Sequence, residues 1–203
     1  MNPSYFYTHV PLDTRDGLVV FDQSGYVVYI AVGRWHTVVA AMTREFYKLG
    51  ASPRPLDKNN ISLRAPVDSI QAFLRNPGDQ TTRDKIKYKY IFGTELQRKV
   101  WKHLENVPFG KTSTYSAVAA ALGMKPSSVR VVANAVGANR LAVLVPCHRV
   151  LGRDGSVTGY RWGIDMKKEL LEAERKGWGK TERESKGKKA VAVEVDGSVG
   201  AAA

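Results

Sequence analysis

Residues 114–136 of this 203-residue chain read TYSAVAAALGMKPSSVRVVANAV and predict two short consecutive helices. Thr114 can cap a first helix that ends at Gly123, and Pro126 can open a second helix that runs to Val136. Two short helices joined by a glycine-containing turn have the outline of a helix-turn-helix. Many helical pairs share this outline, so the pattern alone is a weak indication of nucleic-acid binding.

Another helix is expected immediately before this pair. Thr94 is its predicted N-cap, and Gln97 stands three residues later, where the partner of a capping box belongs. The apolar stripe consists of Leu96, Val100, Leu104 and Val107, and Pro108–Gly110 ends the helix.

The segment after the pair, Leu141–Val145, is a continuous apolar run, which predicts a buried strand. This strand would lead directly into Pro146-Cys-His-Arg-Val150. Met166–Glu174 has helical spacing and is the last predicted helix, with Leu170 and Leu171 on its inner face. The second half of the chain is therefore expected to be mostly helical around one strand.

The first 85 residues have a different pattern. The predicted elements are strands Leu18–Asp22 and Tyr26–Val32 around a turn at residues 23–25, helices His36–Leu49 and Val67–Leu74, and a polar loop Pro53–Asn60. We expect a structural α/β unit over residues 1–85 and a mostly helical unit over 86–175, with Tyr88–Phe92 as a short strand or linker between them. Residues 176–203 lose apolar periodicity and are expected to form a disordered tail.

Charge is unevenly distributed along the chain. Of the net charge of +12, residues 1–85 carry +2, residues 86–175 carry +8 and residues 176–203 carry +2. The excess indicates a polyanionic partner for the second unit, although a generally basic surface would give the same count. In the tail, Lys186–Lys189 is either a weak nuclear address or simply solvated charge.

Composition also excludes several classes of protein. The chain has no stretch near the ~20 apolar residues of a membrane span, and Met1–Val10 does not have the pattern of a secretory signal. The single cysteine, Cys147, excludes an internal disulfide and a cysteine-rich zinc site.

Cys147 is the candidate nucleophile. A thiol becomes strongly nucleophilic only when it loses its proton, and an imidazole that a carboxylate orients can take that proton. His148 is adjacent, but neighbours on an extended chain point to opposite sides, so contact requires a turn or a bridging water. The late carboxylates that could orient it are Glu169, Glu172 and Glu174, and the residues themselves do not choose among them.

Pro146-Cys-His-Arg-Val150, with Asn139–Val145 before it and Gly159-Tyr-Arg-Trp-Gly163 after it, resembles the active-site signature of the O6-alkylguanine-DNA alkyltransferases, also called methylated-DNA–protein-cysteine methyltransferases. The resemblance extends over roughly residues 90–175. It implies a two-domain α+β protein: a ribonuclease-H-like N-terminal domain, and a C-terminal domain with a winged-helix-like helix-turn-helix and an active-site strand.

The resemblance implies a role for each site residue. Cys147 accepts the alkyl group, His148 acts through a water as its base, Glu174 orients His148, and Asn139 organises the turn that carries the site. Tyr115 helps to rotate the target nucleotide and donates to the leaving guanine, Arg130 enters the base stack, Tyr160 lines the guanine pocket, and Trp162 narrows its rim. Glu172 is the alternative partner of His148.

Each of these roles has a plainer alternative. Tyr115, Tyr160 and Trp162 could be ordinary core aromatics, and His148 a satisfied core histidine. Arg130 could be a solvated surface charge. The alanines of the second helix, Ala133, Ala135 and Ala138, would permit close approach to a groove, but helix propensity also favours alanine there.

The implied reaction is direct reversal of DNA damage. A flipped O6-alkylguanine, or O4-alkylthymine, in double-stranded DNA gives its alkyl group to Cys147, and each molecule reacts once. We expect a monomer that needs no organic cofactor, and no metal site because the N-terminal part has no cysteine; the nucleus or nucleoid is the expected location, although the sequence does not determine the compartment. Two rival classes remain. A protein that marks lesions without transfer would leave no label from methylated DNA on Cys147, and a Cys-His-Glu hydrolase would turn over an acyl substrate.

Overall fold

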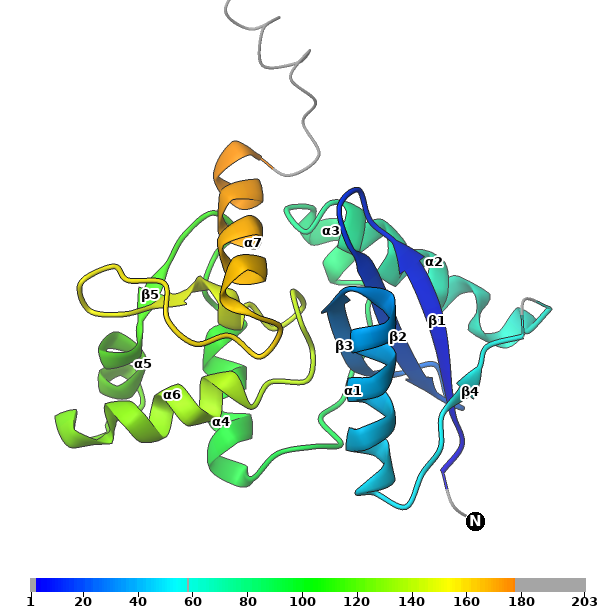
Figure 1. Cartoon of the computed structure of the whole chain (residues 1–203), viewed down its shortest axis with the longest axis horizontal. Coiled ribbons are helices and arrows are strands. Elements are labelled where there is room, and N and C mark those ends of the chain that lie inside the picture. The colour runs from blue at the N-terminus through cyan, green and yellow to red at the C-terminus, as the bar shows by residue number, and fades with distance from the viewer. Residues whose placement is uncertain (1–2, 58, 178–203) are drawn as a thin grey trace, which may run out of the picture.

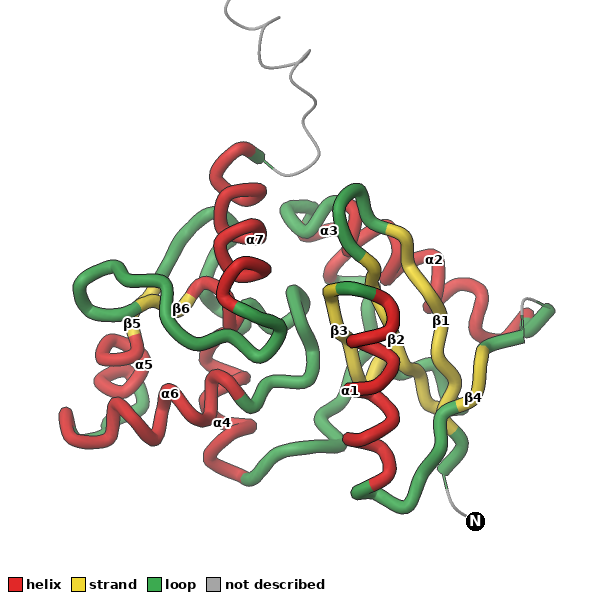
Figure 2. Tube along the Cα trace, viewed as in Figure 1, coloured by secondary structure: helices red, strands yellow, loops and turns green. Residues whose placement is uncertain are grey.

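The structure is a computed structural model that describes residues 3–57 and 59–177. Figures 1 and 2 show a small sheet with helices on both faces and, beside it, a group of helices from the second half of the chain. The described part of the chain is therefore a mixed α/β protein. None of its helices is both long enough and apolar enough to cross a membrane.

The sheet is built around the predicted hairpin, which is confirmed as β2 (Asp16–Asp22) and β3 (Val27–Gly33). Gly25 has φ 81° in the turn between them, a conformation that favours glycine. β1 (Tyr5–Pro11) was not predicted, because its polar and apolar residues do not alternate regularly. It pairs antiparallel with β2, and the short β4 (Arg54–Pro55) lies parallel to β1, which gives the order β3-β2-β1-β4.

The outer edge of β3 is covered by two later segments of the chain. Val27 forms a bridge with Tyr88, and Ile30 forms one with Leu141. At the second bridge, the amide of Ile30 donates to the carbonyl of Arg140 (2.8 Å), and the amide of Ala142 donates to the carbonyl of Ile30 (3.1 Å). The sheet thus holds the backbone just upstream of Cys147. Outside its bridge at Tyr88, the segment Tyr88–Phe92 is a linker.

Helices cover both faces of the sheet (Figure 1). α1 (Trp35–Tyr47) packs on one face, and its predicted range ran two residues too far. α2 (Ile61–Arg75) packs on the other and begins six residues earlier than predicted, at the cap Asn60. The prediction started this helix after Pro66, whose missing amide N–H usually marks a boundary. The short α3 (Gln80–Arg83) follows.

The helices of the second half begin at or near their predicted starts, although the first ends before Val107, the last residue of its predicted apolar stripe. α4 (Glu95–Leu104) begins at Thr94 with both hydrogen bonds of the predicted capping box. α5 (Tyr115–Ala121) is capped by Thr114, and α6 (Val129–Gly137) follows a 3-10 turn over Pro126–Ser128. The last helix is α7 (Ile164–Lys176), and the two-residue strands β5 (Ser113–Thr114) and β6 (Val150–Leu151) pair in parallel.

The predicted active-site strand over Leu141–Val145 is wrong. All five residues are buried, as the apolar run indicated, but the backbone forms a compact turn. The amide of Leu144 donates to the carbonyl of Ala142, and that of Val145 to the carbonyl of Leu141. Val143 has φ 67°, which is strained for a β-branched residue. An apolar run reports burial but not backbone conformation.

A continuous core joins the two halves of the chain. The same cluster contains Phe73 and Leu74 of α2, Trp101 of α4 and Leu170 of α7. The division into units at 1–85 and 86–175 therefore stays a prediction. Of the predicted tail, Lys176 and Gly177 belong to the end of α7, and residues 178–203 lie outside the described residues.

Candidate active site

Cys147 begins a 3-10 turn, Cys147–Arg149, directly after the compact turn and is 4% exposed. The side-chain amide of Asn139 donates to its Sγ (3.1 Å) and to the carbonyls of Leu141 (3.2 Å) and Val145 (2.9 Å), while its oxygen accepts from the amide of Leu141 (2.9 Å). One buried side chain therefore satisfies the backbone of the turn and contacts the thiol. The hydrogen bonds of Asn139 thus satisfy backbone groups of this segment that pairing with a neighbouring strand would otherwise satisfy.

His148 is fully buried and lies against Glu174. Its Nε2 is 2.7 Å from Oε1 of Glu174. The guanidinium of Arg149 also donates to both carboxylate oxygens, at 2.9 to 3.1 Å. The alternative partner Glu172 pairs instead with Arg175 on the surface. The structure thus brings Glu174, and not Glu172, to the imidazole.

The charges around His148 determine its tautomer. Burial alone would raise the pKa of Glu174, but its hydrogen bonds and ion pairs with His148 and Arg149 lower that pKa to about 2. Burial lowers the pKa of His148, so the ring is neutral near pH 7 even though the Glu174 carboxylate favours its protonation. An ionised carboxylate can only accept, so Nε2 carries the proton and donates it to Glu174. Nδ1 is left with a free lone pair and has no hydrogen-bond partner among the described residues.

Lys167 is a buried cation whose charge acts on the thiol, and the sequence analysis did not identify it. Its Nζ donates to the carbonyls of Val150 (2.5 Å) and Thr158 (2.8 Å) and lies 3.4 Å from the hydroxyl of Tyr115. Burial lowers the pKa of Lys167 to about 8, although a thiolate at Cys147 favours its charged form. Lys167 shares a helix face with Leu170 and Glu174, at i+3 and i+7, which was a usable signal for an inward-facing residue.

Burial also dominates the thiol itself. It raises the pKa of Cys147, although the amide of Asn139 and the ammonium of Lys167 both oppose the rise. The thiol is therefore protonated near neutral pH in the absence of a base. Reaction at Cys147 requires a group that accepts its proton.

Both tyrosines predicted for the site, Tyr115 and Tyr160, are at least half-buried, and Tyr115 contacts Lys167. The hydroxyl of Tyr115 donates to the carbonyl of Thr158 (3.1 Å). The hydroxyl of Tyr160 is buried without a hydrogen-bond partner in the described part of the chain. Burial, and the charge of a nearby Cys147 thiolate, raise the pKa of Tyr160 well above its ordinary value. Tyr160 is thus a protonated, unused donor beside the sulfur.

Trp162 packs against the sheet, and Arg130 lies on the surface. The indole of Trp162 packs edge-on against Tyr29 of β3 (ring centroids 6.0 Å apart), and the guanidinium of Arg161 lies over it. These contacts support the alternative of an ordinary packed aromatic, and its place at the pocket rim stays a prediction. Arg130 is exposed on α6 and forms no ion pair within residues 3–57 and 59–177.

Apart from Arg130, the exposed residues of α6 are uncharged and no larger than valine or asparagine. Val131 is 47% exposed there, and Asn134 and Gly137 are exposed on the same side. A Cβ added at Gly137 would meet no atom within 4 Å, so no packing inside the chain requires glycine at this position. Across the described ranges, no group of three or more His, Cys, Asp or Glu side chains could hold a metal ion.

Similarity to known proteins defines the class. Residues 95–176 match the family model described as "6-O-methylguanine DNA methyltransferase, DNA binding domain". The chain is 38% identical over 183 residues to the methylated-DNA–protein-cysteine methyltransferase of Scheffersomyces stipitis, covering 83% of this chain and 92% of that protein. It is 37% identical over 173 residues to the protein of that name from Candida albicans, covering 83% and 95%.

Solved structures agree with these matches. The fold is similar to a crystal structure of Mycobacterium tuberculosis O6-methylguanine methyltransferase, with TM-score 0.63, 26% identity, and 89% and 99% of the two chains covered. It is also similar to Mycobacterium tuberculosis OGT in complex with DNA, with TM-score 0.61, 26% identity, and 85% and 93% covered. The chain belongs to the methylated-DNA–protein-cysteine methyltransferase family.

Proposed function

We propose that this protein repairs DNA by transferring an alkyl group from O6 of guanine to Sγ of Cys147, once per molecule. The same geometry would accept O4-alkylthymine, which presents a similar alkylated oxygen. The proposal rests on one observation in a member of this family. Cys147, His148 and Glu174 are all buried, His148 contacts Glu174, and Nδ1 of His148 has no hydrogen-bond partner among the described residues.

The proton leaves Cys147 by way of His148. Nδ1 of His148 holds a lone pair because Nε2 donates to Glu174. A water between Sγ and Nδ1 passes the thiol proton to the imidazole, and Glu174 stabilises the resulting imidazolium. Arg149 keeps Glu174 ionised throughout this step. Lys167 supplies a positive charge that favours the thiolate.

The thiolate attacks the alkyl carbon in line with the bond to O6. A carbon–sulfur bond forms, the bond between carbon and O6 breaks, and its electron pair leaves with guanine. The hydroxyls of Tyr115 and Tyr160 are protonated donors that can stabilise the leaving base. The thioether has no leaving group that water or His148 could displace, so the protein is consumed.

DNA is proposed to bind along α5 and α6. Arg130 is exposed at the start of α6 and has no ion-pair partner among the described residues, and a planar guanidinium there can fill the gap that a flipped base leaves. The small exposed face of α6 suits a close approach to the minor groove. We further propose that α5 and α6 form a winged-helix-like helix-turn-helix, and that the sheet order β3-β2-β1-β4 is ribonuclease-H-like. A monomer is expected to be sufficient.

The test is mass measurement of the intact protein and its peptides after exposure to duplex DNA that contains O6-methylguanine. We expect the Cys147 peptide to gain one methylene equivalent, in proportion to protein, with no turnover. Cys147→Ala should take up no label yet bind the same DNA with unchanged affinity, because the thiol does not contact phosphates. Transfer retained in Cys147→Ala would overturn the proposal. DNA binding without label in the wild type would favour a lesion-marking protein.

A further inference from the structure

Glu45 of α1 lies where the first half of the chain meets the two segments that border Cys147. Its side chain is 7% exposed. Oε2 accepts from Nη2 of Arg140 (3.0 Å) and from its Nε (3.2 Å), and Oε1 accepts from Nη2 of Arg161 (2.7 Å). One carboxylate thus binds two arginines that are 21 positions apart in the sequence.

Each arginine directly follows a residue of the candidate active site. Arg140 follows Asn139, whose amide contacts the sulfur of Cys147. Arg161 follows Tyr160, whose hydroxyl is buried near the same sulfur. A shift of either arginine would therefore be transmitted through one peptide bond to a group beside the thiol.

Glu45 binds both arginines, and Arg140 also donates to the carbonyl of Ala138. Their side chains are only 16% and 19% exposed, so water replaces little of the ion pairing. Burial opposes ionisation of Glu45, but Arg140 and Arg161 together lower its pKa. Without the carboxylate, two half-buried positive charges would lose their shared counterion and repel each other. Lys48 adds only a distant contact at 3.6 Å and is 63% exposed.

We propose that Glu45 is a positioning residue for alkyl transfer: by holding Arg140 and Arg161 together, it sets Asn139 and Tyr160 relative to Cys147. The inference rests on the proposed function and gives α1, which lies outside the DNA-binding half, a part in the reaction. Glu45 itself touches neither sulfur nor base.

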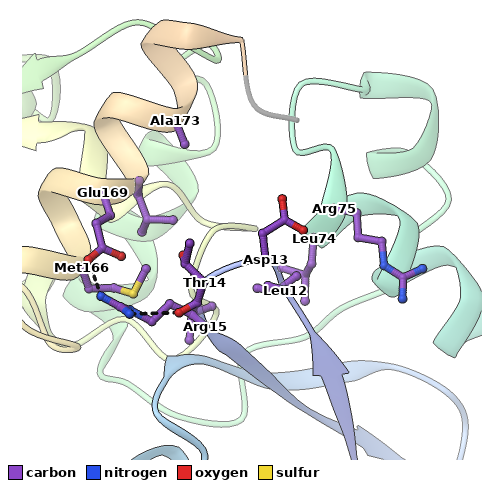
Figure 3. Close-up of a pocket in the computed structure, with 11 residues that line it drawn as sticks. Leu12, Asp13, Thr14, Arg15, Leu74, Arg75, Met166, Glu169 and Ala173 are labelled. Atoms are coloured by element: carbon purple, nitrogen blue, oxygen red, sulfur yellow. Dashed lines mark hydrogen bonds and ion pairs between the residues drawn. The ribbon is translucent and has the colours of Figure 1, made fainter. Parts of the chain in front are cut away.

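The chain offers a matched control in Glu169 of α7. Glu169 pairs with Arg15 across a pocket of about 210 Å³ between α7 and the β1–β2 turn (Figure 3). This second ion pair also joins the two halves of the chain, but neither partner is next in sequence to Asn139 or Tyr160. Glu169→Gln removes an inter-half ion pair without disturbing the two active-site segments.

The experiment compares Glu45→Gln, Arg161→Gln and Glu169→Gln with the wild type in two measurements. The first is amide hydrogen exchange by mass spectrometry. We expect Glu45→Gln and Arg161→Gln to exchange faster in segments 139–147 and 157–163, with β1 and β2 unchanged. The second is the single-turnover rate of methyl transfer from duplex DNA together with DNA affinity. We expect the rate to fall at least about tenfold, as small misplacements of reacting groups do, with affinity unchanged.

The outcomes separate the two proposals. If the wild type takes up no methyl group, the proposed function fails, and the exchange measurement still decides whether Glu45 holds the two segments. If the wild type transfers and Glu45→Gln transfers equally fast, the positioning role is overturned. An equal loss of transfer rate in Glu169→Gln would also overturn the positioning role, because the loss of any ion pair between the two halves would then slow the reaction. If Glu45→Gln does not fold, Arg161→Gln tests the positioning role in its place, because it removes one of the two ion pairs and leaves the pair of Glu45 with Arg140 intact.

Discussion

At the scale of single residues, the site is defined by buried charges that satisfy one another. Glu174 is ionised because Arg149 and His148 both contact it, and its folded-state pKa of about 2 lies below its ordinary value of 4.5. A carboxyl whose pKa is lowered by folding stabilises the fold at pH values above its unfolded pKa. That stability is lost as the pH falls through the folded pKa.

Acid should therefore destabilise the protein between about pH 4.5 and 2 through this one group. The shift corresponds to about 3 kcal/mol. We expect Glu174→Gln to be less stable than the wild type at pH 7, and to lose less stability than the wild type on acidification over this range. Denaturant unfolding at several pH values measures both. A parallel decline in the two proteins would show that other carboxyls dominate acid unfolding.

Lys167 should control the reactivity of the thiol. Its charge opposes the rise that burial causes in the pKa of Cys147. Lys167→Met removes that charge and so raises the pKa of Cys147 further, and we expect slower methyl transfer at pH 7. The wild-type advantage should shrink above about pH 8, where Lys167 loses its own proton. The pH profile of single-turnover transfer in both proteins tests this, and Lys168→Met on the same helix is the control.

At the scale of elements, α6 presents the surface that DNA should contact. Arg130→Ala should slow repair in duplex DNA much more than reaction with a free alkylated base, because the arginine is needed only where a base leaves a stack. Lys99→Ala, on the exposed side of α4, is the matched loss of one positive charge. Equal losses on the duplex and the free base would assign Arg130 to folding or to the pocket.

Most elements could be predicted from the sequence because their ends carry strong local signals. The capping box at Thr94 and the cap at Thr114 are local chemistry, and both helices begin where expected. The turn over Leu141–Val145 could not be predicted, since its conformation depends on hydrogen bonds from Asn139 and on an edge of β3 more than a hundred residues upstream. Local apolar patterning contains neither contact.

The candidate site was predictable only in part, because only some of its residues belong to a recognisable motif. Cys147, His148 and Glu174 stood out by chemistry and resemblance, and the structure brings them together. Glu45 and Lys167 carried no motif of their own. Their importance arises from burial beside partners that are distant in sequence, which a single sequence does not report.

At the scale of the whole molecule, the sulfur sits inside the packing that joins the two halves. Cys147 is 4% exposed and belongs to the common core. An added methyl group should overpack this site at a cost of about 1–3 kcal/mol. We expect the alkylated protein to melt at a lower temperature than the unreacted protein, measured by calorimetry on fully methylated samples. A higher melting temperature after reaction would contradict this packing.

Charge at the same scale governs encounter with DNA. The +8 of residues 86–175 should displace counterions from the phosphate backbone. We expect the logarithm of the DNA affinity to fall linearly and steeply with the logarithm of salt concentration. Fluorescence anisotropy with an undamaged duplex measures the slope, and a flat response would exclude binding through backbone phosphates.

The covered edge of β3 has a consequence for how the chain is made. During translation, Ile30 leaves the ribosome long before Leu141, its partner at that edge. At roughly 5–20 residues per second, the nascent sheet waits on the order of ten seconds with part of an edge strand unprotected. Unpaired edge strands readily join other chains. We therefore expect the sheet to be the part of the nascent chain that most needs a chaperone during translation. A chain truncated before residue 141 should aggregate.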